Sequence, residues 1–226
     1  MPGEAPRNRF ATASMPEREL AFCDGLDQSP TARVPDLDDE VVRPAFLAHI
    51  VFLTNRIEAM RAWWRTVLGG APMMTGKGLE FITFDDEHHR VAIFARDQLR
   101  DKGPEVDIAG MHHVAFTYGS LGDLVATYKR LKAAGIVPMR TIHHGITVSN
   151  YYLDPDNNRV ELQVNAFASK AKLNAWLAGR PFNDNPIGVL FDFEELAARL
   201  EAGEDEAVLL TPPTVTTESA LAEEAV

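Results

Sequence analysis

The chain has 226 residues, of which 46% are hydrophobic and 24% charged, and its net charge is −11. This length and composition are typical of a folded protein with a sizeable core, and the acidic balance argues against nucleic acid as a partner. Cys23 is the single cysteine, so an internal disulfide is excluded. No apolar run reaches the length of a membrane span and no apolar leader precedes the core. These features predict a cytoplasmic protein with no membrane partner.

The region 1–44 contains several prolines, an acidic run at 36–40 and little periodicity, which predicts an N-terminal arm. After this arm the sequence repeats itself once. The segment starting at His49 (HIVF) aligns with the segment starting at His113 (HVAF). Further along, the segment starting at Asp85 (DDEHHRVAI) aligns with the one starting at Asp154 (DPDNNRVEL), at a slightly larger offset in the numbering. Two matching segments in the same order indicate a tandem repeat whose second copy carries a small insertion.

Each copy of the repeat is predicted to form a strand, a helix and three further strands. Apolar residues spaced by three and four indicate the helices, which end near Gly69 and Gly135. The predicted strands cover residues 46–53, 71–75, 79–84 and 89–95 in the first copy and 111–118, 137–142, 147–153 and 158–164 in the second. The sequence therefore predicts an α+β fold in which two βαβββ modules, 46–96 and 111–165, form a curved mixed sheet around a metal-binding cup. Together they make a domain over 45–166, with the linker 97–109 between them.

A helical extension is predicted to follow the repeat over residues 167–210. Its two helices are expected at 169–178 and 191–200, with Asp192 as the N-cap of the second. Residues 211–226 are predicted to be a disordered tail.

All seven histidines lie between His49 and His144, and six of them form adjacent pairs. Strand alternation puts His49, His113 and Glu161 on the face of the predicted sheet that points away from the helices. Two imidazoles and one carboxylate form the facial triad of non-haem Fe(II) oxygenases, which leaves neighbouring coordination positions open. Ala92 occupies the repeat position equivalent to Glu161, so the first module offers no fourth ligand. The sequence therefore predicts an open metal site with three protein ligands.

Four segments carry a resemblance to a known family: HIVFLTN, DDEHHRVAIF, MHHVAF and HGITVSNYYLDPDNNRVELQ. Over residues 47–164 the chain resembles the vicinal oxygen chelate superfamily, and within it the small single-domain type I extradiol ring-cleaving dioxygenases. The resemblance implies that His49, His113 and Glu161 bind Fe(II), with Mn(II) as an occasional substitute. It also implies that the substrates are a catechol-type aromatic diol and O2, and we expect a homo-oligomer.

The resemblance assigns catalytic roles to further residues. His89 is expected to stabilise bound oxygen, although strand alternation favours its neighbour His88. His144, with His143 as the alternative, and Tyr151 are expected to hydrogen-bond a substrate oxygen. The remaining histidine, His112, is predicted to pack on the apolar side of its strand.

Two other functions compete with the dioxygenase prediction. A metal-dependent isomerase or lyase of glyoxalase type usually has a fourth protein ligand, and Ala92 counts against it. A non-enzymatic small-molecule binding module commonly lacks the metal ligands that this sequence retains. The sequence does not identify the particular diol.

Overall fold

We describe the protein from a computed structural model, which defines residues 33–37, 40–103, 109–179 and 187–213. The chain divides into two compact units. One comprises Asp36–Arg140 with Asn150–Val164, and the other comprises Met1–Pro35, Thr141–Ser149 and Asn165–Val226. Among the described residues, no helix combines the length and the apolar character needed to span a membrane.

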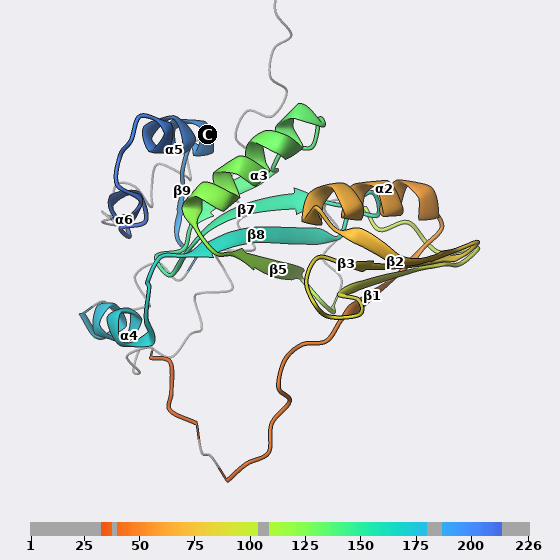
Figure 1. Ribbon diagram of the computed structural model, residues 1–226, viewed down its shortest axis with the longest axis horizontal. Helices are drawn as coiled ribbons and strands as arrows, with labels where there is room; N and C mark the ends of the chain where they lie inside the picture. Colours follow the sequence, from red (N-terminus) through yellow and green to blue (C-terminus); the bar gives the residue numbers. More distant parts are fainter. Residues whose placement is uncertain (1–32, 38–39, 104–108, 180–186, 214–226) are drawn as a thin grey trace, which may run out of the picture. The chain divides into compact units, whose positions relative to one another are not determined.

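The first module contains one helix and a four-stranded sheet (Figure 1). Its elements are β1 (Ile50–Thr54), α2 (Ile57–Leu68), β2 (Ala71–Gly76), β3 (Leu79–Thr83) and β4 (Val91–Ala95), and the strand order is β1-β4-β3-β2. β1 pairs with β4 in parallel, whereas β3 pairs with β4 and with β2 in antiparallel fashion. The sheet is therefore mixed, as expected for a βαβββ unit.

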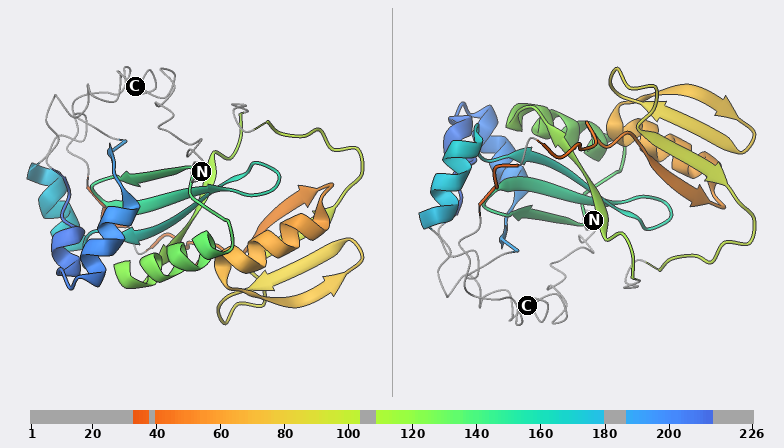
Figure 2. Two further views of the ribbon diagram at one scale, coloured as in Figure 1. Left: turned by 90° about the horizontal axis from the view of Figure 1, so that it is seen from above. Right: turned by 90° about the horizontal axis from the view of Figure 1, so that it is seen from below.

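The second module repeats this arrangement, and both helices can be compared from two sides in Figure 2. Its elements are β5 (His113–Tyr118), α3 (Leu121–Ala133), β6 (Arg140–His143), β7 (Thr147–Leu153) and β8 (Arg159–Asn165). The strand order is β5-β8-β7-β6-β9, in which β9 (Val189–Leu190) is an added edge strand. The prediction of an α+β fold with two tandem βαβββ modules is confirmed, but the strands form two sheets and not one continuous hydrogen-bonded sheet.

Strand register confirms the alignment of both repeated segments. Ile50 pairs with Val91 in the first module, and Val114 pairs with Val160 in the second. Ile50 and Val114 are equivalent in the repeat, because each directly follows the histidine that begins its aligned segment. Val91 and Val160 are equivalent as well, because each directly follows the arginine of its aligned segment. The same repeat positions are therefore hydrogen-bonded neighbours in both modules. One residue further along β4 and β8, Ala92 is the structural counterpart of Glu161.

The helices pack on the sheets through the apolar stripes that the sequence predicts. In α2 the buried stripe includes Met60, Trp64 and Val67, each 0% exposed, and α3 has a corresponding set at Leu121, Leu124, Tyr128 and Leu131. On β8 the alternate residues Val160, Leu162 and Val164 are buried. This burial supplies most of the driving force for folding each module.

A fully buried carboxylate ties the β2–β3 hairpin to α2. Glu80 on β3 is 0% exposed. Its Oε1 accepts from Nε of Arg65 at 2.5 Å, and its Oε2 accepts from the Thr75 hydroxyl at 2.8 Å and lies 3.4 Å from Nε of Arg61. A buried carboxylate is unfavourable unless cations and hydrogen-bond donors surround it. The β2–β3 hairpin can therefore pack against α2 only with these partners around Glu80.

The C-terminal segment contains α4 (Lys170–Gly179), α5 (Phe193–Glu201) and α6 (Glu206–Leu209). The two predicted helices correspond to α4 and α5. Asp192 is the N-cap of α5, because its Oδ1 accepts from the backbone N–H groups of Glu194 and Glu195. The sequence prediction did not include β9 or α6. Most of the predicted N-terminal arm, and the predicted tail from residue 214 onward, lie outside the described residues.

Candidate metal and diol site

The second module brings two of the three predicted metal ligands together. His113 is the first residue of β5 and Glu161 lies on its parallel neighbour β8. Nε2 of His113 is 3.0 Å from Oε2 of Glu161. The glutamate side chain is 6% exposed and the imidazole 33% exposed, so the pair connects a buried carboxylate to a ring that solvent reaches.

Two more residues contact His113. Nδ1 of His112 lies 2.6 Å from Nδ1 of His113, so one of these nitrogens donates and the other accepts. The ring of buried Tyr151, on β7, stands edge-on to the His113 ring with 5.6 Å between centroids. The packing prediction for His112 is wrong: the residue is exposed, because β5 begins one residue later and strand alternation does not extend into the preceding loop.

The first module gathers His49, His89 and Phe81 in one stack. The His89 ring lies between the other two, with centroids 4.4 Å from each. Burial lowers the pKa of His89, and the neighbouring imidazoles of His49 and His88 lower it further, so the neutral form is favoured. His88 is exposed and its Nε2 contacts Glu87 at 3.0 Å. Both histidines of the pair precede β4, so strand alternation does not decide between them, and it is His89 that reaches His49.

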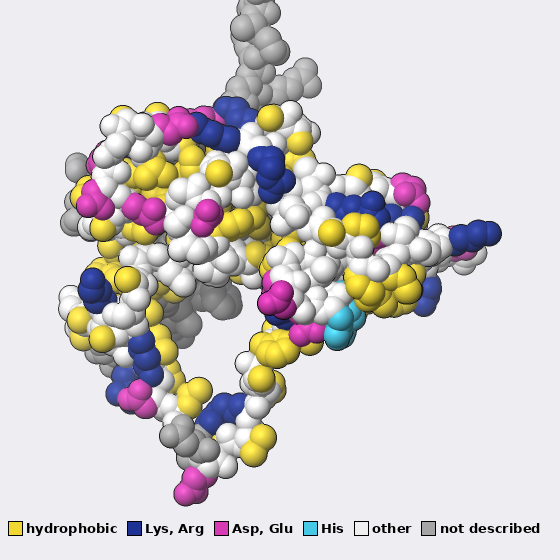
Figure 3. Space-filling view, in the orientation of Figure 1, with side chains coloured by type: hydrophobic (Ala, Val, Ile, Leu, Met, Phe, Trp, Pro, Cys, Tyr) yellow, Lys and Arg dark blue, Asp and Glu magenta, His cyan; other side chains and the backbone are white. Residues whose placement is uncertain are grey.

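His49 itself is exposed and lies immediately before β1. Within β1, Val51 and Leu53 are 51% and 55% exposed, while Phe52 between them is buried. Figure 3 shows a histidine side chain at the molecular surface, next to acidic side chains and near hydrophobic ones. An imidazole next to exposed apolar side chains is suited to contact an aromatic ligand.

The structure does not gather all three predicted ligands in one cluster. Within the described ranges, no group of three or more His, Cys, Asp or Glu side chains is close enough to hold a metal ion. His113 and Glu161 form one pair, and His49 and His89 form another. The three-ligand metal site stays a prediction.

His143 and His144 lie in the other compact unit, at the end of β6 and in the turn after it. The backbone N–H of Gly145 donates to Nδ1 of buried His143 at 3.0 Å, which leaves the proton of a neutral ring on Nε2. Nδ1 of His144 contacts the carbonyl of Ile187. The proposed role of His144 toward substrate stays a prediction.

Sequence reasoning missed the contacts that join the two modules. The Trp64 indole on α2 donates to Oδ2 of buried Asp154 in the β7–β8 turn at 3.2 Å, and Arg56 reaches the same turn. The Asp-Pro-Asp motif marked this turn in the sequence. No spacing rule linked it to a tryptophan 90 residues earlier.

The chain belongs to the Glyoxalase/Bleomycin resistance protein/Dioxygenase superfamily, which it matches over residues 46–162. Two relatives come from Rhodococcus globerulus. Biphenyl-2,3-diol 1,2-dioxygenase 2 is 47% identical over 69% of this chain and 82% of its own length. Biphenyl-2,3-diol 1,2-dioxygenase 3 is 39% identical over 73% of this chain and 87% of its own length.

Among solved structures, a glyoxalase/dioxygenase from Nostoc punctiforme aligns with 57% of this chain and 99% of its own. The sequence identity is 17% and the TM-score 0.45.

Proposed function

We propose that this protein is an Fe(II)-dependent extradiol dioxygenase that opens the ring of a catechol-type aromatic diol with O2. The pair of His113 and Glu161 carries the proposal, because it is a histidine–carboxylate pair in a family whose similar members are diol dioxygenases. The names of those relatives describe cleavage between carbons 1 and 2 of a 2,3-diol, which is beside the two hydroxyl groups and not between them.

The spacing of the pair is that of a hydrogen bond or ion pair, and two ligands of one metal ion can take the same spacing. Neighbouring ligand atoms on an octahedral ion, each about 2.1 Å from it, lie about 3.0 Å apart. Nε2 of His113 and Oε2 of Glu161 are 3.0 Å apart. The pair therefore fits a divalent metal, and His49 is the third ligand that the proposal requires. When bound, Fe(II) would supply Lewis-acid charge for the ionised diol and a site for O2 beside it, and the electrons that reduce O2 would come from the diol.

The chain's own residues would orient the diol and move protons. The Tyr151 side chain, beside His113, is suited to hydrogen-bond a substrate oxygen. The His89 ring stacks on His49, and an imidazole in that place is suited to accept or donate a proton. The role of His144 toward a substrate oxygen stays a prediction from the family resemblance. The exposed apolar side chains on β1 favour an aromatic substrate over a small polar one.

The register of the first module disfavours the isomerase alternative. Val51 pairs with Ala92 where Ala115 pairs with Glu161. A glyoxalase-type site with four protein ligands would need a ligand at residue 92, and alanine has none. The proposed site therefore keeps a coordination position for the second substrate.

Metal content and oxygen uptake test this function. The full chain is purified without oxygen and loaded with Fe(II), and oxygen uptake is followed together with the yellow ring-opened product for catechol and 2,3-dihydroxybiphenyl. We expect uptake with at least one diol and loss of bound iron in Glu161→Ala. Gln163→Ala, on the same face of β8 and bonded to Thr117, is the matched control for iron content. An unchanged iron content in Glu161→Ala would contradict the ligand assignment, and iron-loaded protein that consumes no oxygen with either diol would contradict the activity.

A further inference from the structure

A cavity of about 270 Å³ lies among the C-terminal elements of the chain. Its walls come from the end of β6 and from β9, α5 and α6, which are labelled in Figures 1 and 2 or follow one another along the chain there. All residues that line it belong to the compact unit that contains Thr141–Ser149 and Asn165–Val226. None of these lining residues is a proposed metal ligand, and all except His143 lie outside the range 46–162 that matches the superfamily. The cavity is therefore built from other residues than the proposed diol site.

One wall of the cavity is apolar. Leu196 of α5 and Leu209 of α6 are 7% and 6% exposed, and Val189 of β9 and Phe191 directly after this strand also line it. A cavity of about 150 Å³ with apolar walls is large enough to bind benzene. The larger volume here accommodates an aromatic ring with a substituent or a second ring, and burying such a ring against this wall is favourable.

His143 adds a hydrogen-bond donor to this apolar surrounding. The residue is 7% exposed and is the last residue of β6, where it pairs with Val189. Its Nδ1 accepts from the backbone N–H of Gly145 at 3.0 Å, so the proton of the neutral ring is on Nε2. The imidazole can therefore donate to a ligand but not accept from it. A ligand that contacts His143 needs an accepting oxygen, as a hydroxyl or a carbonyl group has.

The charged side chains that line the cavity disfavour an anionic ligand. They are Asp192, Glu195 and Arg199, and all three are exposed. The Arg199 guanidinium forms an ion pair with Glu204, with 2.6 Å between Nη2 and Oε1. Two carboxylates against one guanidinium give the lining a net negative charge, which repels an anion. A neutral molecule does not experience this repulsion.

We propose that this cavity binds a small neutral aromatic molecule with a hydroxyl or carbonyl oxygen, of which a phenol is the simplest case. Its ring would lie against the apolar wall, and its oxygen would accept from Nε2 of His143. A phenol keeps its proton at neutral pH, since its pKa is close to the value of about 10 for tyrosine. This inference does not depend on the proposed metal site, and it gives His143 a role different from that of His144.

Titration of the full chain with 2-phenylphenol tests this inference. Binding is followed by NMR of the leucine and valine methyl groups, and the dissociation constant is obtained from their chemical shifts. Val189, Leu196 and Leu209 report on the cavity, whereas exposed Val51 and Leu53 are the internal control on another apolar surface. Biphenyl-2-carboxylate is the anionic probe, because it has the same two rings and a negative charge.

We expect 2-phenylphenol to bind with a dissociation constant of about 1 mM or lower, which is usual for a ligand of this size. His143→Phe keeps a flat ring and removes the donor, so affinity should fall about fivefold. Leu209→Phe narrows the cavity and should lower the affinity about tenfold. The matched control is Val208→Phe, which should bind as the wild type does because Val208 is 55% exposed on the same helix and does not line the cavity.

The charge of the lining is tested with the anionic probe. Biphenyl-2-carboxylate should bind at least about fivefold more weakly than 2-phenylphenol, because the lining carries a net negative charge. Glu195→Gln should reduce this difference. Glu194→Gln is the matched control, since Glu194 is an exposed neighbour that does not line the cavity, and it should leave the difference larger than Glu195→Gln does.

Three results would overturn the inference. Wild-type protein without saturable shifts at Val189, Leu196 and Leu209 would show that the cavity does not bind the phenol. Shifts of equal size and concentration dependence at Val51 and Leu53 would show unspecific contact with apolar surface. Equal affinity for the phenol and the carboxylate would contradict the proposed class of ligand. If Leu209→Phe does not fold, His143→Phe decides, and wild-type affinity in that variant counts against the site.

Discussion

Removing the hydrogen bond between Trp64 and Asp154 should cost a measurable part of the stability of the protein. The Trp64 indole N–H lies 3.2 Å from Oδ2 of Asp154, and these residues are 0% and 3% exposed. Phenylalanine at position 64 keeps an aromatic ring in the core and removes the donor. The carboxylate retains donors from Asp156 and Asn158, so the change isolates the contact between the modules.

The size of the effect follows from the burial of both partners. A hydrogen bond to a charged acceptor contributes about 1.5–3 kcal/mol, and water does not replace the lost donor at a buried carboxylate. Trp64→Phe also leaves a small cavity, so its total effect exceeds the bond alone. A double-mutant cycle with Asp154→Ala removes the cavity contribution, and we expect a coupling free energy of about 1.5–3 kcal/mol.

Urea unfolding followed by circular dichroism measures this coupling without relying on tryptophan fluorescence. The matched control is Trp63→Phe in the same cycle. Trp63 lies next to Trp64, with 5.2 Å between ring centroids, and is only half-buried. Its coupling to Asp154 should stay below about 0.5 kcal/mol, as for residues that share no contact. Equal couplings for the two tryptophans would refute the argument that the Trp64 indole bonds the second module.

Two other predictions concern buried and exposed ion pairs. Glu80→Gln should lower the free energy of unfolding by about 3 kcal/mol, because it leaves Arg61 without its buried carboxylate. Glu58→Gln, at the exposed partner of Arg61, should change it by less than about 0.5 kcal/mol, and equal losses in urea unfolding would contradict this. The Arg199 guanidinium lowers the pKa of Glu204 from 4.5, so the pair stabilises the fold above that pH. The difference in stability between the wild type and Glu204→Gln should therefore disappear as the pH falls through the lowered pKa, and a difference that grows in acid would contradict the assignment.

The sequence predicted the modules well, because the two copies of a repeat can be compared with each other. One aligned segment covers the first strand of each module and the other covers the last strand. This alignment predicts that Ile50 pairs with Val91 as Val114 pairs with Val160, and the strand register of both modules agrees with it. Hydrophobic periodicity placed both helices, since each buries a continuous stripe on its sheet. The short elements β9 and α6 were missed because two to four residues show no periodicity.

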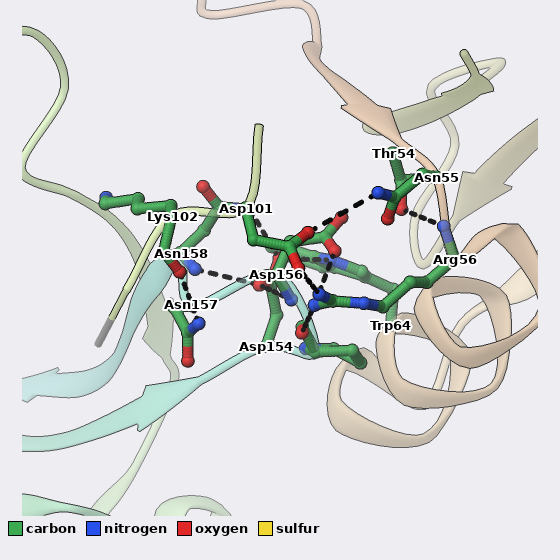
Figure 4. A network of polar contacts seen from close by, with 11 residues as sticks. Thr54, Asn55, Arg56, Trp64, Asp101, Lys102, Asp154, Asp156, Asn157 and Asn158 are labelled. Atoms are coloured by element: carbon green, nitrogen blue, oxygen red, sulfur yellow. Dashed lines mark hydrogen bonds and ion pairs between the residues drawn. The ribbon is translucent and has the colours of Figure 1, made fainter. Parts of the chain in front are cut away.

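The candidate site was less predictable, because it depends on how loops and modules pack. Strand alternation describes residues inside a strand, and it failed for His112, which precedes β5. It gave no reliable choice between His88 and His89 for the same reason. No sequence pattern linked the start of α2 to the turn between β7 and β8, where Arg56 contacts Asp156 (Figure 4).

The bond between Trp64 and Asp154 also bears on how the chain folds during synthesis. The first module is translated before the second, and its helix α2 carries Trp64, which packs on Phe52 of β1 and on Phe116 of the second module. The acceptor for the indole N–H is made 90 residues later, so until then that donor has no carboxylate to bond. A nascent first module is therefore less stable than its core alone would make it, and it completes its packing when the second module emerges. The two halves of the repeat are expected to fold as one cooperative unit and not as independent domains.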